Sequence, residues 1–546
     1  MTRPATYDAI VVGAGFSGIY MLYRLRAMGL SARVLEAGTG PGGTWFWNRY
    51  PGLRCDVESM TYSYSFSDEL QREWTWTERY ATQAEIERYI NWVVDRLDLR
   101  RDIQFETRVT SAVFDEASER WSIGTERGDQ IEARYCVMAT GCLSVPNMPR
   151  IKGLERFKGR WVHTADWPRE EIDFKGKRVG VIGTGSSGVQ AIPVIAEEAA
   201  HLTVFQRTAN HSIPAWNHPL TEEAVRRWKE GYKPLRAKAL VSPVGDVFDP
   251  PTQGVFEVSA DERWRRLEKH WQLGSFGFLS AFNDMLTNKA SSDTVGAFVD
   301  AKIRAVVKDP AVADKLCPRN LPIGTKRLCV DTNYYETFNR DNVTLIDIKA
   351  NPIDEITPSG LRAGGVDHPL DIIVFAIGYD AMTGALLRIN PRGRDGVALK
   401  ERWQHGPRTY LGLMVAGFPN LFTVTGPGSP SVISNMLVSI EQHIDWIADC
   451  IAHLERNGRA LIEATPEAEE RWTRHVTEVA EGTLFLQAET WYVGANIPGK
   501  PRVIYPYLGG VGAYRVICDG VAAKDYEGFR VSRGKTPTAT AARRAS

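Results

Sequence analysis

Two glycine-rich segments of the chain have the residue types and spacing that bind the phosphates of a dinucleotide. Residues 13–18 and 183–188 each read G-x-G-x-x-G, follow an apolar strand pattern and open a helix. The first glycine permits a tight turn, the second lets the backbone approach a pyrophosphate, and the third allows close helix packing. Free N–H groups at the helix start then bind the phosphates. Two copies in strand–turn–helix–strand context predict two dinucleotide sites.

The residues that end the second strand of each unit differ, and they suggest which dinucleotide each unit binds. The strand pattern Ala32–Leu35 ends at Glu36, whose carboxylate can accept the ribose hydroxyls of an adenosine. The corresponding strand Leu202–Phe205 is followed by Gln206, Arg207 and Thr208. A carboxylate would repel a ribose 2′-phosphate, whereas a guanidinium and a hydroxyl would hold it. We therefore predict FAD at the first unit and NADPH at the second.

A third segment, residues 41–56, bears on where the flavin's electrons go. In disulfide reductases with two dinucleotide units, a Gly-Gly-Thr at this place is followed by a redox cysteine pair. Here Gly43 and Thr44 are followed by Trp45, and the nearest thiol is the lone Cys55. The seven cysteines include no C-x-x-C pair, so no disulfide scaffold, dithiol relay or metal site is expected. The sequence therefore favours O2 as the electron acceptor.

These motifs require an α/β fold with two Rossmann-like dinucleotide-binding domains, for FAD and NADPH, and a helical insertion. The insertion is expected because strand–helix alternation disappears after about residue 215, where Ser259–Trp271 reads as an amphipathic helix. Further strands are expected at Val343–Ile348, at Asp371–Phe375 and from Asn420, and a helix from about Val432 to His453. The predicted ranges are residues 1–145 and 381–532 for the FAD domain, 146–215 and 323–380 for the NADPH domain, 216–322 for the insertion and 533–546 for a disordered tail.

Composition limits the classes of partner and the location. The 546 residues carry 66 basic and 66 acidic side chains, so charge gives no reason to expect nucleic acid or an anionic membrane as a partner. The N-terminus lacks an apolar signal-peptide core, and no apolar run approaches the length of a membrane span. We expect a cytoplasmic protein and take a monomer as the default.

The segment between the two glycine motifs carries a pattern that resembles a known family. Phe157, Gly159, His163 and Trp167-Pro168 fit F-x-G-x-x-x-H-x-x-x-W-P, the fingerprint of type I Baeyer–Villiger monooxygenases. The resemblance extends over nearly the whole chain, and residues 426–432 are most similar to the phenylacetone and steroid monooxygenase branch. One departure is Ile377, which stands where the family often has threonine. We expect His163 to lie in the link between the two units and not to act as an acid or base.

The resemblance implies the reaction. NADPH reduces the flavin, O2 gives a C4a-peroxyflavin, and attack on a ketone yields an ester or lactone; sulfides are expected to be oxidised too. It implies that Arg327 is the fixed cation beside the peroxide, because arginine does not release its proton at working pH, and that Asp56 positions it. Without the resemblance, a structural ion pair is the favoured interpretation of these two residues. The implied partners are a small ketone and O2.

The resemblance, together with the two motifs, also gives the cofactor-binding residues. For FAD they are Gly13, Gly15, Ser17, Gly18, Glu36, Gly43, Thr44, Trp45, Trp47, Asp56, Tyr62, Val109 and Met436. For NADP they are Arg54, Cys55, Asp56, Gly183, Gly185, Ser186, Ser187, Gly188, Gln190, Arg207, Thr208, Lys326 and Trp491. The loop after Trp491 is expected to close over NADP and substrate.

Two alternative functions stay open. A flavin monooxygenase that oxygenates nitrogen or sulfur has a similar fingerprint, but it usually lacks the Trp167-Pro168 ending. A flavin-dependent electron-transfer reductase or a non-catalytic dinucleotide sensor is the other alternative. The missing dithiol argues against the reductase, and the presence of Arg327 and Asp56 argues against the sensor.

Overall fold

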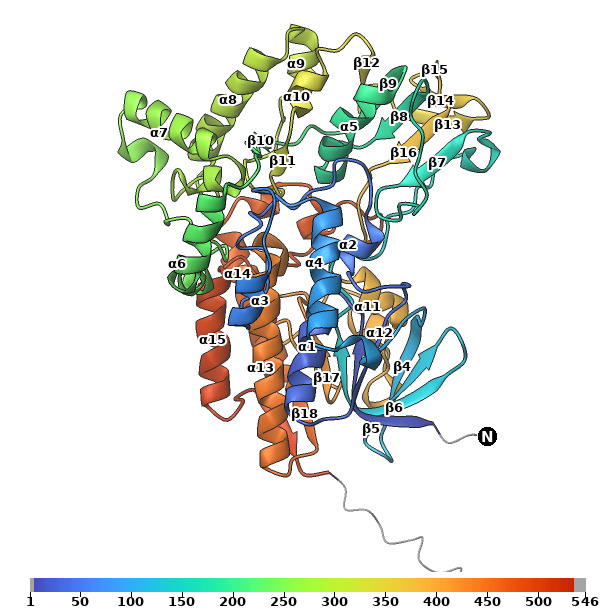
Figure 1. The fold of residues 1–546 in the computed structure, drawn as a ribbon, viewed down its shortest axis with the longest axis vertical. Coiled ribbons are helices and arrows are strands. Elements are labelled where there is room, and N and C mark those ends of the chain that lie inside the picture. The colour runs from blue at the N-terminus through green and yellow to red at the C-terminus, as the bar shows by residue number, and fades with distance from the viewer. Residues whose placement is uncertain (1–3, 535–546) are drawn as a thin grey trace, which may run out of the picture.

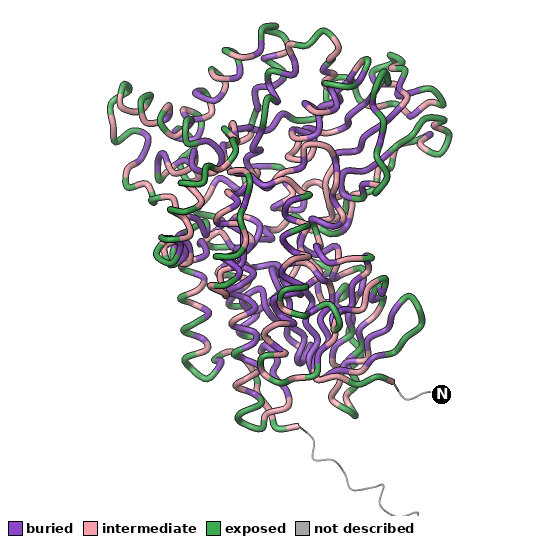
Figure 2. The backbone as a smooth tube through the Cα atoms, viewed as in Figure 1, coloured by how far each residue is buried: buried purple, intermediate pink, exposed green. Residues whose placement is uncertain are grey.

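The computed structural model describes residues 4–534, and its two largest sheets occupy opposite halves of the molecule. Figure 1 shows the sheet that contains β1 and β6 in the lower half and the sheet that contains β8 and β9 in the upper half. The backbone of both sheets is largely buried, and exposure concentrates in helices and loops at the periphery (Figure 2). Of the tail predicted for residues 533–546, residues 535–546 lie outside the described part.

The first sheet is built around the first glycine motif and has the order β3-β2-β1-β6-β5-β4, with β17 also paired to β6. Strands β3, β2, β1, β6 and β17 are parallel to one another, while β4 and β5 form an antiparallel extension on β6. Residues Ala9–Val12 of β1 and the apolar side chains of β6 are buried, as expected for parallel strands covered on both faces. The strand bounds are β1 (Ala5–Val12), β2 (Ala32–Leu35), β3 (Ile103–Gln104), β4 (Val109–Asp115), β5 (Arg120–Thr125), β6 (Gln130–Met138) and β17 (Leu421–Thr423).

The second sheet is entirely parallel, in the order β12-β9-β8-β16-β7. The strand patterns predicted around the second glycine motif and near residues 343 and 371 are all members of it. Strand β7 was not predicted. The residues expected to form a link between the units, His163 among them, instead pair in register with β16. The bounds are β7 (Arg160–His163), β8 (Arg178–Ile182), β9 (His201–Gln206), β12 (Val343–Asp347) and β16 (Ile372–Phe375).

The region between the halves of the second sheet is helical, as predicted. Its helices are α6 (Glu222–Val241), α7 (Ala260–Leu273), α8 (Lys289–Val306) and α9 (Pro310–Leu316). Each begins after a capping side chain, and the cap predicted at Ser259 accepts a hydrogen bond from the backbone N–H of Glu262. The two ends of the region meet in a parallel ribbon of β10 (Ser212–Pro214) and β11 (Cys329–Asp331). This ribbon carries the chain on both sides of the insertion toward the middle of the molecule.

The helix predicted from Val432 to His453 is divided in the structure. Ser431–Ile433 forms a short 3-10 turn, and α13 (Met436–Arg456) begins only after Asn435. The Asn435 side chain accepts the backbone N–H of Leu437, which caps the helix and explains the later start. Helix α13 packs along α1 (Phe16–Ala27), which follows the first glycine motif.

The remaining elements complete the surface around the two sheets. The helices are α2 (Thr44–Trp47), α3 (Asp68–Glu73), α4 (Gln83–Arg96), α5 (Ser186–Glu198), α10 (Tyr334–Thr337), α11 (Gly384–Ile389), α12 (Leu399–Arg402), α14 (Pro466–Glu481) and α15 (Val511–Ala523). The strands are β13 (Ile353–Thr357), β14 (Gly360–Ala363), β15 (Val366–Pro369), β18 (Leu461–Ala464) and β19 (Phe529–Ser532). None of the helices within residues 4–534 combines the length and hydropathy needed to cross a membrane.

The loop after α6 contains a buried acid that generates a stability prediction. Asp246 is buried, accepts the backbone N–H of Val247 and forms no ion pair with any described residue. Burial raises its pKa to about 7. The folded state therefore keeps a proton that the unfolded chain releases near pH 4, so the free energy of unfolding falls as pH rises from about 4 to about 7.

We expect Asp246→Asn to remove this pH dependence, because an amide needs no proton to stay neutral. The variant should be more stable than the wild type by about 2–4 kcal/mol at pH 8, and the difference should disappear near pH 4. Thermal unfolding at both pH values measures this. Asp249→Asn is the matched control, since Asp249 is exposed and pairs with Lys238. Equal pH dependence in Asp246→Asn and the wild type would contradict the prediction.

Candidate active site

The first glycine motif leaves backbone N–H groups free at the start of α1. Gly15 is the residue before the helix, and no side chain caps it. A side chain at Gly18 would place its Cβ 1.8 Å from the carbonyl oxygen of Gly13, and one at Gly13 would lie 2.7 Å from that of Ala139. These glycines are therefore required for the close approach of turn, helix and β6. Ser17 lies in the first turn of α1, so the geometry fits the predicted pyrophosphate site.

Glu36 stands at the end of β2, but it already has hydrogen-bond donors in the protein. Its Oε2 accepts the backbone N–H of Ala14 at 2.7 Å, and its Oε1 accepts that of Gly38 at 2.7 Å. Burial raises its pKa, although the two backbone bonds act in the opposite direction. A carboxylate has about four acceptor positions, so about two remain for ribose hydroxyls. Val109 begins β4 close by, because the N–H of Thr107 donates to the Glu36 carbonyl at 2.8 Å.

The second glycine motif repeats the first in geometry. Gly183 has a φ of +107°, and a Cβ there would lie 2.4 Å from the carbonyl oxygen of Ala376. A Cβ at Gly188 would lie 2.2 Å from the carbonyl oxygen of Gly183. At Gly185, in contrast, an added Cβ would meet no protein atom within 4 Å. Ser186 and Ser187 open α5 without a side-chain cap, so the space in front of this helix fits a phosphate group.

Two cations without acidic partners lie beyond β9, where a 2′-phosphate is predicted. Arg207 and Thr208 are exposed, and Gln206 is buried and donates to the carbonyl of Lys315 at 2.7 Å. Burial lowers the pKa of Lys326, and the nearby charge of Arg207 lowers it further. Within residues 4–534, neither Lys326 nor Arg207 forms an ion pair. The structure thus brings together two cations that a phosphate would compensate, which fits NADPH.

The loop 44–56 connects the two glycine motifs. Gln190 of α5 donates to the carbonyl of Arg54 at 3.0 Å and accepts the hydroxyl of Tyr50 at 2.9 Å. A Cβ at Gly52 would lie 2.2 Å from the carbonyl oxygen of Gln190, so the loop lies directly on α5. The Arg54 side chain itself pairs with Glu78. The loop therefore spans from the expected flavin site to the expected NADPH site.

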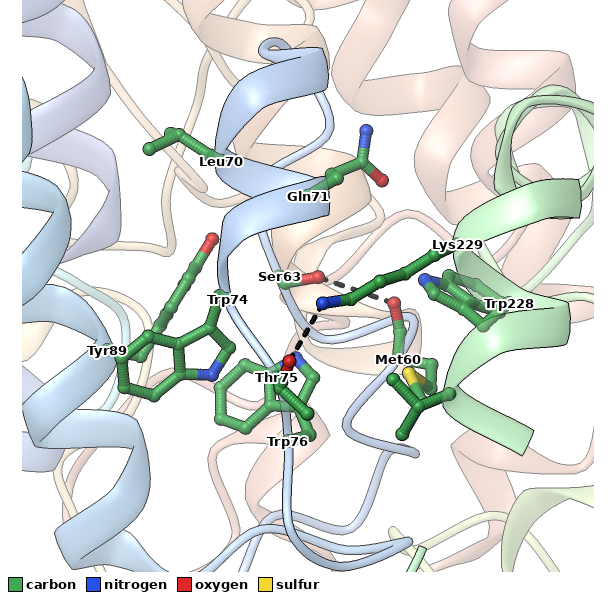
Figure 3. A pocket seen from close by; sticks show the side chains of 11 residues that line it. Met60, Ser63, Leu70, Gln71, Trp74, Thr75, Trp76, Tyr89, Trp228 and Lys229 are labelled. Carbon is green, nitrogen blue, oxygen red and sulfur yellow. Dashed lines mark hydrogen bonds between the residues drawn. The ribbon is translucent and has the colours of Figure 1, made fainter. Parts of the chain in front are cut away.

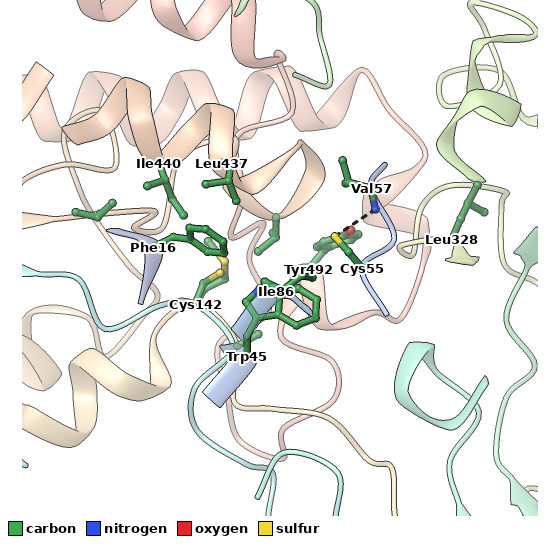
Figure 4. Close-up of a cluster of buried hydrophobic side chains, with 14 of the residues drawn as sticks. Phe16, Trp45, Cys55, Val57, Ile86, Cys142, Leu328, Leu437, Ile440 and Tyr492 are labelled. Atoms are coloured by element: carbon green, nitrogen blue, oxygen red, sulfur yellow. Dashed lines mark hydrogen bonds between the residues drawn. The ribbon is translucent and has the colours of Figure 1, made fainter. Parts of the chain in front are cut away.

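Trp45 is buried at the place where a reductase would have a redox cysteine. Its indole N–H donates to the hydroxyl of Tyr62 at 3.2 Å, and Figure 4 shows it beside Cys55 and Tyr492. The other two residues predicted on this stretch, Thr44 and Trp47, begin and end α2, which starts after Gly43. Burial raises the pKa of the Cys55 thiol, so it is a poor nucleophile. All seven cysteines are buried free thiols. No dithiol is present to receive electrons.

Asp56 and Arg327, far apart in sequence, form an ion pair at the centre of the molecule. Arg327 donates from Nε to one carboxylate oxygen of Asp56 at 2.5 Å and from Nη2 to the other at 2.8 Å. Its Nη1 donates to the carbonyl of Val432 at 2.7 Å. Burial alone would lower the pKa of Arg327, but the charge and hydrogen bonds of Asp56 raise it above its usual value. The guanidinium is therefore a permanent cation with a fixed orientation.

Two buried hydroxyls without partners lie near this pair. Thr425 Oγ1 and Ser431 Oγ are buried and have no hydrogen-bond partner among the residues that the structure describes, and Ser431 is next to Val432. Met436, predicted to contact FAD, starts α13 a few residues further on. Buried hydroxyls without partners are rare in proteins, so polar groups of a bound molecule are expected here. In the sequence, Ser431 fell only within the range 426–432 that resembles one branch of the family, and Thr425 was missed.

The fingerprint residues support the second sheet and lie apart from the charge pair. A Cβ at Gly159 would lie 2.3 Å from the carbonyl oxygen of Asp371, so glycine lets β7 approach the start of β16. His163 Nδ1 accepts the N–H of Ala165 at 3.0 Å, and burial lowers the pKa of this histidine. Phe157 packs against a core cluster of the second sheet, and Trp167 is buried near Phe174. His163 Nε2 is buried and has no hydrogen-bond partner among residues 4–534, and the expectation that His163 is not an acid or base stays a prediction.

The loop expected to close over the site is connected to the Asp56–Arg327 pair through Tyr492. Trp491 is half-buried, and its ring centroid lies 4.1 Å from that of Tyr492. Tyr492 is fully buried, and after burial the charge of Arg327 has the largest influence on its pKa. Sequence reasoning missed Tyr492, because tyrosine after tryptophan in a loop carries no pattern of its own.

A small cavity of about 10 Å³ lies elsewhere, between the loop 60–76 and α6. Figure 3 shows its lining by Trp74, Trp76 and Tyr89, with Lys229 donating to Thr75 across it. A volume of this size holds one water at most. We therefore do not place a cofactor there.

Comparison with known proteins adds to this geometry. Residues 10–250 match the family described as pyridine nucleotide-disulphide oxidoreductase. A Baeyer-Villiger monooxygenase of Pseudooceanicola batsensis is 43% identical over 532 residues, 97% of this chain and 96% of that protein. A phenazine N-monooxygenase of Lysobacter antibioticus is 43% identical over 527 residues, 96% of each chain.

Solved structures match with the same coverage. The structure of an oxidized steroid monooxygenase bound to NADP superimposes with a TM-score of 0.93 at 52% identity, covering 97% of this chain and 100% of that one. A complex of the protein designated OTEMO with FAD and NADP gives a TM-score of 0.94 at 40% identity, with the same coverage.

The contrast between Gly185 and Gly188 generates a prediction. Gly185→Ala should fold normally, because its Cβ meets no protein atom, yet it should raise the Kd of NADPH at least about 10-fold by filling space that the phosphates need. Gly188→Ala should lower the free energy of unfolding by about 1–3 kcal/mol, because its Cβ overlaps the turn. Thermal unfolding and titration with NADP+ measure the two effects.

Gly520→Ala, in α15, is the control for a glycine with open space around it. It should neither raise the Kd of NADPH nor lower the free energy of unfolding. If Gly185→Ala bound NADPH as the wild type does, the open space at α5 would not be the phosphate site.

Proposed function

This chain belongs to the Baeyer–Villiger monooxygenases, and from that premise we propose that Arg327, held by Asp56, is the cation that stabilises the oxygenation step. The protein is an FAD- and NADPH-dependent monooxygenase that converts ketones to esters or lactones. The observation that carries the proposal is the bidentate Asp56–Arg327 pair. We further propose that the protein acts as a monomer on a small ketone and O2.

The bound cofactors supply hydride transfer and oxygen activation, while the residues of the chain position the reactants and stabilise charge. A guanidinium has five N–H donors. Asp56 accepts two from Arg327 and Val432 accepts a third, which leaves two for other acceptors. Addition of oxygen to a ketone carbonyl leaves negative charge on oxygen, and two preoriented N–H groups would stabilise that charge. Because Asp56 raises the pKa of Arg327, the group offers charge without offering a proton.

Burial around the pair would keep water away from the reacting oxygen. Trp45, Cys55 and Tyr492 are buried and line the same cluster (Figure 4). Water in such a site would compete for the two remaining N–H groups of Arg327 and weaken their effect. The apolar lining would therefore strengthen the electrostatic contribution of the guanidinium.

We propose the cofactor contacts on the same basis. FAD would be held by the first glycine motif, Glu36, the loop from Gly43 and the start of α13 at Met436. NADPH would be held by the second motif, Gln190, Arg207 and Lys326. Residues 1–145 with 381–532 would then form the FAD domain, and 146–215 with 323–380 the NADPH domain, with the insertion between them.

A second candidate function is oxygenation of nitrogen or sulfur. It is favoured by one observation, the 43% identity to a phenazine N-monooxygenase over nearly the full chain. A substrate panel that contains ketones, sulfides and N-heteroaromatic compounds, with ¹⁸O2 as the oxidant, separates the two. Ester that contains one ¹⁸O atom supports the first proposal, and N-oxide without any ester supports the second.

Replacement of the cation tests the proposed role. Arg327→Ala should retain FAD and be reduced by NADPH, but its rate of ester formation should fall by about 100- to 1000-fold, because a preoriented donor is lost. The ester formed per NADPH consumed is the measurement. Arg178→Ala, which removes a surface ion pair with Asp371, should stay within about twofold of the wild type. Ester formation by Arg327→Ala at the wild-type rate would refute the role.

Asp56→Asn separates positioning from charge. The amide keeps the shape of the carboxylate but donates on one side, so it can hold only part of the guanidinium. We expect a loss of about 10- to 100-fold in ester formation, smaller than that of Arg327→Ala, since the cation itself is retained. An equal or larger loss would indicate that Asp56 does more than orient Arg327.

A further inference from the structure

We propose that Ser275 and Phe276, in the turn after α7, are positioning residues that hold both members of the Asp56–Arg327 pair from the helical insertion. The inference rests on the proposed role of Arg327. Neither residue belongs to a glycine motif, to the loop 44–56 or to the fingerprint. They contribute two different contacts, one to each partner.

Phe276 contacts the cation. Its ring centroid lies 4.7 Å from the Cζ atom of Arg327. The in-plane hydrogen bonds of the guanidinium go to Asp56 and to the carbonyl of Val432. An aromatic face within about 6 Å attracts a cation and is a surface on which a planar guanidinium can stack. Phe276 therefore limits rotation of Arg327 out of the plane that Asp56 sets.

Ser275 contacts the anion side of the pair. Its Oγ donates to the backbone carbonyl of Asp56 at 2.9 Å, and the residue is 2% exposed. Its φ of +47° is uncommon for a residue with a side chain. Such a conformation persists only where the surroundings fix it. The bond holds the backbone from which the Asp56 carboxylate projects.

Contacts with two other segments fix the turn after α7. A Cβ at Gly274 would lie 2.4 Å from the carbonyl oxygen of Pro214, so the turn lies directly on the end of β10. Arg79 adds a second connection, because it donates to the carbonyl of Leu273 at 2.9 Å and pairs with Glu58, two residues after Asp56. The segment 273–276 is therefore anchored both to the end of β10 and to the loop that follows Asp56.

Through these contacts the helical insertion would orient the Asp56–Arg327 pair. The two remaining N–H groups of Arg327 point in directions set by Asp56, Val432 and the Phe276 ring together. Without the ring, the guanidinium gains freedom to tilt, and the carbonyl oxygen of the substrate would meet a less ordered donor. A displacement of about 1 Å from the productive geometry can cost about 100-fold in rate. We expect a smaller loss, because the hydrogen bonds remain.

The first experiment compares three variants of the holoenzyme. Phe276→Leu should lower ester formed per NADPH and kcat by about 3- to 10-fold, with Kd for NADP+ and FAD content unchanged. Phe276→Tyr keeps the ring and should restore at least half of the wild-type value. Phe278→Leu is the matched control, since Phe278 lies in the same turn but packs on Trp271 and Phe298. It should lower thermal stability without lowering the ester-to-NADPH ratio.

A comparison of ketones separates positioning from lining of the substrate pocket. Positioning predicts the same fold-loss in kcat for a small linear ketone and for a bulky aryl or cyclic ketone. A pocket-lining role predicts a change in KM that depends on ketone size, and that result would overturn the proposal. A crystal structure of Phe276→Leu gives a readout independent of turnover, and we expect Arg327 in more than one orientation there.

Ser275→Ala tests the second contact. It should reduce the ester-to-NADPH ratio about 2- to 5-fold, whereas Ser280→Ala, which removes a hydroxyl bonded to Gly277 in the same turn, should not. Equal behaviour of the two serine variants, or of Phe276→Leu and Phe278→Leu, would refute positioning by this turn. Wild-type ester formation by Arg327→Ala would refute the proposed role of Arg327 itself. Failure of that proposal is therefore distinguishable from failure of positioning by Ser275 and Phe276.

Discussion

The charge of Arg327, whose side chain is only 18% exposed, is the constraint on which the site depends. Removal of one partner from a buried ion pair typically costs about 3–5 kcal/mol, because a desolvated charge is left uncompensated. Arg327 meets this demand with two oxygens of Asp56 and the carbonyl of Val432. Those acceptors come from the first and last parts of the chain. Compensation of one charge therefore fixes three distant segments relative to one another.

Arg327 and Asp56 lie in loops that are attached to different sheets. Arg327 precedes β11, which pairs with β10 where the chain leaves the second sheet. Asp56 ends a loop that begins beside the first glycine motif and lies on α5, where Gly52 approaches the carbonyl of Gln190. Both partners thus depend on contacts with each dinucleotide unit. A reaction that uses two cofactors in turn needs a charge whose position is tied to both sites, and this topology provides one.

Local sequence patterns predicted the parts of the fold that local physics decides. β2 and the strand–helix–strand unit around Gly183 follow from apolar periodicity and from the glycines that the turns require, and the cap at Ser259 follows from helix-end chemistry. Strand β7 was missed because Arg160–His163 is a short edge strand whose first two residues are exposed and whose last two are buried, so it shows no alternating pattern. The turn after α7 was missed because Ser275 and Phe276 gain their significance only from residues that are distant in sequence. The pair Asp56 and Arg327 needed the family resemblance, since spacing alone favoured an ordinary ion pair.

The chain matches a family described by disulphide chemistry, yet its centre has no dithiol. Trp45 occupies that place, and burial raises the pKa of the neighbouring Cys55 thiol, so electrons have no sulfur acceptor. The overall fold does not by itself determine which substrate atom is oxygenated, because a phenazine N-monooxygenase is 43% identical to this chain. In an N-oxide the formal negative charge on oxygen is balanced by the adjacent positive nitrogen, whereas addition to a carbonyl gives a tetrahedral adduct with a net negative charge on oxygen. A permanent cation with N–H donors stabilises the net negative charge of the carbonyl adduct more than the internally balanced charge of an N-oxide. The rigid hold on Arg327 therefore argues for carbonyl chemistry, and the residues that maintain this hold are where selectivity between the two reactions would arise.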